Sequence, residues 1–141
     1  MTVRLWMIRF AGEDLANSFS LSELVSKLNS GCGSECAAKV YSFINGVLDW
    51  GNIVLDALRY VHDVHQDGDE LNDVIVGVRI ELDKLNFLRE RVRVALINRS
   101  DVYDYDNVVM WYMEARMILN KIRRLFNVND KFESVLVDIG I

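Results

Sequence analysis

Apolar residues recur every three or four positions over much of the chain, which is the pattern of helices that bury one face. One such repeat, between residues 50 and 64, comprises Ile53, Val54, Ala57, Leu58, Val61 and Val64. A longer repeat of about five turns comprises Val108, Trp111, Tyr112, Ala115, Leu119, Ile122 and Phe126. We therefore predict a helix over each stretch, packed through its apolar side.

A third repeat, from Leu21 to Leu28, is bounded by clear start and stop signals. Ser20 followed by Glu23 forms a capping box at its beginning, because each side chain can bind a free backbone N–H of the first turn. The segment 29–33, Asn-Ser-Gly-Cys-Gly, favours a turn at its end. The pattern predicts a short helix followed by a break.

The next helix is expected to begin near Ser34 and to end at about Asn45, with Gly46 as its C-terminal stop. Asp49 stands where an N-cap would begin the following helix. Further breaks are expected at residues 66–68 and 98–104. Together these signals predict six or seven helices.

Residues 73–82 fit two kinds of secondary structure. The even-numbered positions from Val74 to Leu82 are all apolar, as in a strand. Helical spacing fits equally well through Ile75, Val78, Leu82, Leu85 and Phe87 or Leu88. We predict a helix, because the periodic pattern continues to Ile97 and a single strand would have no evident partner.

Composition supports an all-α fold in a single domain over residues 1–141. The chain contains no proline, where average usage of about 5% would give about seven. Hydrophobic residues make up 51% of the chain, which excludes a disordered protein. This apolar content indicates a well-filled core, an apolar surface that meets a partner, or both.

The formal net charge of −5 argues against nucleic acid as a partner, because phosphate-binding surfaces need clustered Lys and Arg. Neither a signal peptide nor a transmembrane helix is recognisable. We therefore expect no integral membrane anchor, and the segment 132–141 is too short and too acidic to be one.

We find no constellation that predicts catalysis, a metal site or a cofactor. Cys32 and Cys36 are too few for a disulfide framework, and we interpret them as inert or weakly reactive thiols in a reducing compartment. His62 and His65 flank Asp63 but lack a third ligand at a supporting spacing. The protein is therefore not expected to be an enzyme.

Residues 43–54, Phe-Ile-Asn-Gly-Val-Leu-Asp-Trp-Gly-Asn-Ile-Val, carry the most distinctive pattern. Gly51 in a helix costs stability unless another group must approach the backbone closely. Trp50 beside it suits an anchor between helices. The segment is typical either of a groove rim or of an ordinary turn between helices with a packing tryptophan.

This segment resembles the first homology motif of the Bcl-2 family, with matches or close substitutions at Asn45, Gly46, Val47, Asp49, Trp50, Gly51, Ile53 and Val54. Upstream, residues 8–14 resemble the third motif of that family, and residues 20–28 resemble the helix that follows it. Downstream, residues 91–112 weakly resemble the second motif and its preceding helix. The short length resembles survival homologues encoded by large DNA viruses such as iridoviruses.

The resemblance implies a helical bundle around a central apolar hairpin, with a surface groove for the BH3 helix of pro-apoptotic proteins of the Bim, Bak and Bax type. The protein would then inhibit apoptosis in the host cytoplasm and reach the mitochondrial outer membrane only peripherally, through its partners. The implied groove contacts are Ala38, Lys39, Ser42, Val47, Asp49, Gly51, Asn52, Leu55 and Arg59. The implied support behind the groove wall comprises Phe43, Trp50, Ile53, Val54 and Trp111.

Two departures from the family pattern bear on this expectation. The arginine that follows Trp-Gly in the family, which pairs with an aspartate of the BH3 helix, is Asn52 here, and we expect weaker binding unless Arg59 reaches the same aspartate. The resemblance also implies that the family's first helix is missing or merged with the next one, because the third-motif resemblance begins within ten residues of the start. The alternative interpretation is a scaffold of the same fold that does not bind BH3 helices and acts by homodimerisation or by holding adaptor proteins.

Overall fold

The computed structural model describes residues 1–65, 68–98, 105–127 and 132–140 and shows an all-α bundle. Its helices are α1 (Leu5–Asn17), α2 (Leu21–Asn29), α3 (Ser34–His65), α4 (Gly68–Asn98) and α5 (Tyr105–Phe126). Two short strands, β1 (Thr2–Arg4) and β2 (Leu136–Asp138), complete the described fold. The all-α prediction is confirmed.

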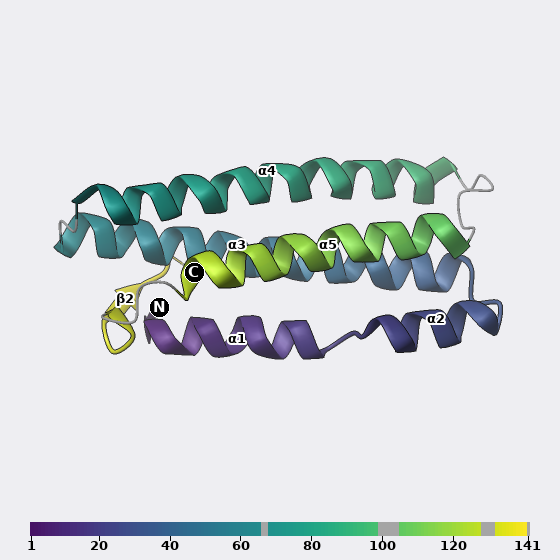
Figure 1. Cartoon of the computed structure of the whole chain (residues 1–141), viewed down its shortest axis with the longest axis horizontal. Helices are drawn as coiled ribbons and strands as arrows, with labels where there is room; N and C mark the ends of the chain where they lie inside the picture. The colour runs from purple at the N-terminus through teal and green to yellow at the C-terminus, as the bar shows by residue number, and fades with distance from the viewer. Residues whose placement is uncertain (66–67, 99–104, 128–131, 141) are drawn as a thin grey trace.

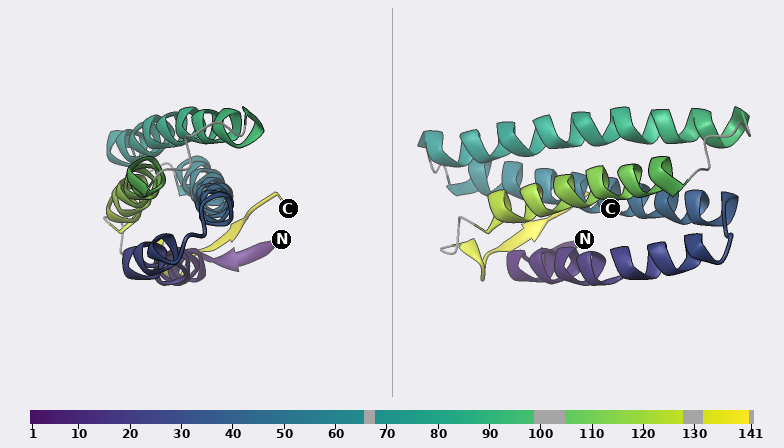
Figure 2. Two further views of the ribbon diagram at one scale, coloured as in Figure 1. Left: turned by 90° about the vertical axis from the view of Figure 1, so that its right-hand side faces the viewer. Right: turned by 45° about the vertical axis from the view of Figure 1, so that its right-hand side comes forward.

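The helices run nearly parallel to one long axis (Figure 1). An end-on view shows α3 and α5 side by side, with α4 covering them on one side and the successive helices α1 and α2 on the other (Figure 2). The long helices α3 and α4 therefore form an antiparallel pair that extends along the whole bundle. No helix within the described residues is both long and apolar enough to cross a membrane.

Most residues of the predicted apolar repeats form the core, but Val64 at the end of the first repeat is 56% exposed and Leu21 at the start of α2 is 38% exposed. Every residue of the repeat in α5, from Val108 to Phe126, is buried. The ambiguous stretch 73–82 is helical, and Ile75, Val78, Leu82, Leu85 and Leu88 are buried while Phe87 is exposed. The helical prediction for α4 is thus confirmed, with Leu88 rather than Phe87 on the inner face.

The predicted boundaries of α2 are also confirmed. The backbone N–H of Glu23 donates a hydrogen bond of 3.2 Å to Ser20 Oγ, which caps the first turn. The helix ends at Asn29, and Gly31 (φ +84°) and Gly33 (φ +42°) adopt left-handed conformations in the turn that follows. The turn therefore depends on glycine at both positions.

The predicted break between Asn45 and Asp49 is wrong, because α3 continues through it as one helix. Val47 and Leu48, expected in an exposed turn, are buried. Packing against neighbouring helices on both sides of this stretch outweighs the local stop and start signals. Because α3 is continuous, the helices of the described residues are α1 to α5, where six or seven helices were predicted. The breaks predicted at 66–68 and 98–104 fall largely outside the described residues, although α3 ends at His65 and α4 ends at Asn98.

The pairing of β1 with β2 was not predicted. The strands are antiparallel, with Thr2 opposite Asp138 and Arg4 opposite Leu136. Three residues of the C-terminal segment, Phe132, Val137 and Ile139, are buried against the bundle. Residues 132–140 therefore pack as part of the folded domain.

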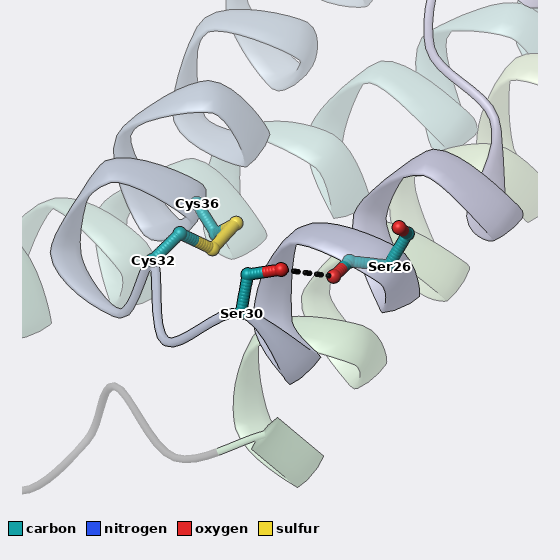
Figure 3. The surroundings of a disulfide bond; sticks show 4 residues. All are labelled: Ser26, Ser30, Cys32 and Cys36. Atoms are coloured by element: carbon teal, nitrogen blue, oxygen red, sulfur yellow. Dashed lines mark hydrogen bonds between the residues drawn. A yellow bond between two sulfur atoms is a disulfide. The ribbon is translucent and has the colours of Figure 1, made fainter.

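Cys32 and Cys36 are joined by a disulfide (Figure 3), which corrects the expectation of free thiols. The glycines on either side of Cys32 fold the turn back onto the start of α3, and the two Cα atoms lie 5.6 Å apart. That separation lies within the usual range for a disulfide. The spacing of the two cysteines in the sequence did not predict the disulfide, because their approach depends on the conformation of the turn.

Candidate functional site: a groove between α4 and α5

The residues predicted to line a groove all lie on α3, but they do not share one surface. Ala38, Lys39, Ser42, Asp49, Asn52 and Arg59 are exposed. Val47, Gly51 and Leu55 are buried in the core, which corrects their expected place on a binding surface. Because α3 does not break at Gly46, these three positions face the neighbouring helices instead of the rim of a groove.

Gly51 shows what the motif glycine does in this fold. A Cβ atom built at Gly51 would lie 2.5 Å from a methyl carbon of Leu82 on α4. The close approach that the sequence suggested is thus made by another helix of the bundle. Gly51 therefore allows α4 to pack tightly on α3.

Trp50 joins α3 to α1, as expected of an anchor between helices. Its Nε1 donates a buried hydrogen bond of 2.8 Å to the carbonyl oxygen of Ile8. Its indole ring covers Gly12, where an added Cβ would clash with the ring, and it meets Phe126 edge-on. Of the other predicted wall residues, Phe43, Val54 and Trp111 are buried and Ile53 is half-buried, so all contribute to the core.

A groove of about 860 Å³ lies instead between α4 and α5. Its apolar floor and rim come from Ile118, which is buried, and from Phe87 and Met117, which are 69% and 68% exposed. The remaining lining residues are polar or charged: Glu81, Asp83, Lys84, Arg91, Glu114, Asn120, Lys121 and Arg124. The groove is therefore amphipathic, and its apolar side chains project into solvent.

Ion pairs fix part of the groove's charge. Arg91 on α4 pairs with Glu114 on α5, and the Arg91 guanidinium also lies 5.6 Å from the centre of the Phe87 ring. Glu81 is buried and accepts a hydrogen bond of 2.9 Å from Lys84 Nζ. With these acids paired, Lys121 and Arg124 leave the α5 side of the groove positive, in a chain whose net charge is −5.

Exposed apolar residues continue along both helices beyond the groove. On α5, Met110, Met113 and Met117 follow one another at helical spacing on the outer face. On α4, the outward apolar residues are Val76, Ile80, Phe87, Val94 and Ile97. We call these two sets the methionine stripe and the α4 stripe.

The sequence contains a signal for the α4 stripe, but helical spacing alone did not identify it. The strand-like alternation from Val74 to Leu82 arises because α4 is apolar on two opposite faces. Val74, Val78 and Leu82 face the core, whereas Val76 and Ile80 face outward. When a helix on the outside of a bundle is also apolar on its outer face, that face indicates a surface that binds a partner.

No group of three or more His, Cys, Asp or Glu side chains within the described ranges is arranged to hold a metal ion. No protein-family model, curated protein or solved structure matches the chain. What the structure defines is the class: an all-α bundle with an amphipathic groove between two of its helices.

Proposed function

We propose that the protein acts by binding, without catalysis, and that it takes an amphipathic helix of a partner into the groove between α4 and α5. We further propose that this partner is the BH3 helix of a pro-apoptotic protein, so that the protein inhibits apoptosis from the host cytoplasm. The observation that carries the proposal is the groove itself, with exposed Phe87 and Met117 beside positive charge. The family and the kind of partner rest on the sequence motifs.

The chemistry of the groove suits an incoming helix. It combines the exposed side chains of Phe87 and Met117 with buried Ile118 between two helices. A helix laid into a groove presents apolar anchors at i, i+3, i+4 and i+7, which can contact the apolar side chains between the antiparallel helices α4 and α5. Methionine is unbranched and polarisable, and the methionine stripe can therefore adapt to anchors of different shapes.

The charge of the groove suits the acidic residue of a BH3 helix. Lys121 and Arg124 lie on the rim near Met117. They offer the cationic partner that the family motif provides at the position of Asn52. A charge-assisted hydrogen bond contributes about 1.5–3 kcal/mol, against about 1 kcal/mol for a neutral one. The proposal therefore assigns to α5 the role that the sequence resemblance gave to α3.

We expect calorimetric titration with a panel of BH3 peptides to give at least one Kd below about 1 μM, which is roughly −8 kcal/mol. Met117→Glu should weaken that binding by about tenfold or more, because a carboxylate would replace an apolar contact of at least 1.4 kcal/mol. Met7→Glu is the matched control, since Met7 is a similarly exposed methionine on α1 and should leave the affinity unchanged.

The same titration separates the kind of partner from the location of the site. Absence of binding across the whole panel would show that the BH3 proposal is wrong. If Asn52→Arg strengthens binding or Arg59→Ala weakens it while Met117→Glu has no effect, the helix binds on the exposed face of α3 and the groove assignment is wrong.

A second candidate function, a scaffold that acts by self-association, is favoured by the α4 stripe. Five large apolar side chains lie along the outer face of α4, from Val76 to Ile97. They are separated by three, four or seven residues, and these are the spacings of the apolar positions through which helices pair. A surface of this kind on the edge of a bundle can bury itself against a second copy of the chain.

For that candidate we expect light scattering to give the mass of a dimer for the wild-type chain. Ile80→Glu should give the mass of a monomer, because pairing would bury an unpaired carboxylate. Val64→Glu is the matched control, since Val64 is similarly exposed on α3 and lies outside the α4 stripe. A monomeric wild-type chain, or equal masses for both variants, would contradict the scaffold interpretation.

A further inference from the structure

The disulfide between Cys32 and Cys36 borders an open cavity that is separate from the α4–α5 groove. The cavity has a volume of about 400 Å³ and is lined by residues of α2, of α3 and of the turn between them. Figure 3 shows the disulfide in that turn. The lining of the cavity comprises Lys27, Ser30, Gly31, Cys32, Glu35, Cys36 and Lys39. A small molecule that enters this cavity therefore reaches the disulfide directly.

The two cysteines differ in exposure. Cys32 is half-buried in the turn, whereas Cys36 is fully buried. Backbone hydrogen bonds from Cys32 N (3.3 Å) and Ser30 N (3.1 Å) to the carbonyl oxygen of Lys27 hold the turn against the end of α2. An attacking group would thus meet the sulfur of Cys32 first.

If the disulfide is broken, the environments of the Cys32 and Cys36 thiolates also differ. Cys36 lies in the first turn of α3, where the helix dipole favours negative charge, although the full burial of Cys36 acts in the opposite direction. A thiol with a stabilised thiolate is the better leaving group in thiol–disulfide exchange. Attack on Cys32 makes Cys36 the leaving group, because the bond between their sulfur atoms is the one that breaks, and the helix dipole at the start of α3 favours the departing thiolate.

Two lysines make the cavity attractive to an anion. Lys27 from α2 and Lys39 from α3 line it together. A bound carboxylate would relieve the repulsion between the two ammonium groups.

We propose that this cavity is a thiol–disulfide exchange site for an anionic low-molecular-weight thiol of the glutathione class. The thiolate of that molecule attacks Sγ of Cys32, the bond between Cys32 and Cys36 breaks, and its electron pair remains on Sγ of Cys36. A second thiolate attacks the outer sulfur of the mixed disulfide and releases the thiolate of Cys32. Two small thiolates are thereby oxidised to one disulfide, and the protein disulfide is reduced to two thiolates.

The test compares two small thiols on the oxidised full-length chain. Glutathione carries carboxylates, whereas cysteamine carries an ammonium group. Loss of the disulfide is followed by alkylation and mass spectrometry. We expect glutathione to react faster than cysteamine at equal thiolate concentration. Lys27→Gln combined with Lys39→Gln should slow the reaction with glutathione by roughly tenfold, because two exposed charges that attract its carboxylates are removed, and should not slow the reaction with cysteamine. Arg79→Gln, a change of an exposed cation on α4, is the control.

A second measurement identifies the attacked sulfur. Treating Cys36→Ala with oxidised glutathione should produce a mixed disulfide on Cys32, whereas Cys32→Ala should leave the buried Cys36 unmodified. Equal rates for the two small thiols, or no effect of the lysine changes, would overturn the proposal, as would modification of Cys36 in place of Cys32. The lysine variants keep both cysteines and the core intact, so the test holds even if a cysteine variant does not fold.

Discussion

Replacing Trp50 by alanine is expected to lower the free energy of unfolding by about 3–5 kcal/mol, the range for removing a large aromatic side chain from a core. Trp50 is buried between α3 and α1, and its ring fills the space left open by Gly12. Its removal would leave a cavity where these helices meet and would leave the Ile8 carbonyl oxygen without its side-chain partner. Urea denaturation followed by circular dichroism measures the change.

One further variant separates the packing of Trp50 from its hydrogen bond, and another serves as a control. Trp50→Phe keeps most of the packing but removes the hydrogen bond to Ile8, and we expect a cost of about 1–3 kcal/mol. Trp6→Ala is the control, because Trp6 is 40% exposed on the outer side of α1. If Trp50→Ala cost no more than Trp6→Ala, the packing of α1 on α3 described here would be incorrect.

Tyr112→Ala is expected to have an effect of similar size, about 3–5 kcal/mol by analogy with other buried aromatic residues. Tyr112 on α5 stacks on Phe43 of α3 and meets Phe19 edge-on, with ring centres 5.4 Å apart in both contacts. Its hydroxyl donates a buried hydrogen bond of 2.6 Å to the carbonyl oxygen of Phe19. One side chain thus joins α5, α3 and the connection between α1 and α2.

Thermal or urea unfolding of Tyr112→Ala and Tyr112→Phe measures the contributions of the ring contacts and of the hydroxyl hydrogen bond to the free energy of unfolding. The phenylalanine variant retains the ring contacts and should lose only the hydrogen bond, at about 1–3 kcal/mol. Tyr105→Ala serves as the control, since Tyr105 at the start of α5 is 44% exposed. Equal stability of the two Tyr112 variants would contradict the role given to the ring contacts.

The sequence predicted the parts of the fold that depend on local signals. The apolar repeat of α5 and the cap at Ser20 are set by spacing and residue type, and both are confirmed. The continuity of α3 is set by packing on Gly46 and Gly51, where Leu15 of α1 and Leu82 of α4 approach. No local signal reports the position of a neighbouring helix, which explains why the break at Gly46 was predicted wrongly.

The same distinction applies to the sites. The sequence identified Trp50 as an anchor between helices, and the structure shows its partners. The α4–α5 groove joins residues such as Arg91 and Glu114 that lie on separate helices, and sequence spacing could not place them together. The disulfide likewise depends on the left-handed turn at Gly31 and Gly33.

The pairing of β1 with β2 has a consequence for the order in which the chain folds. Its register joins Thr2 to Asp138, so the ladder closes a loop that contains nearly the whole chain. The entropy lost on closing a loop grows with its length, and contacts between distant residues form slowly unless intervening structure has already shortened the distance. The helices must therefore assemble before the ladder can form, and the two strands report on completion of the bundle instead of nucleating it.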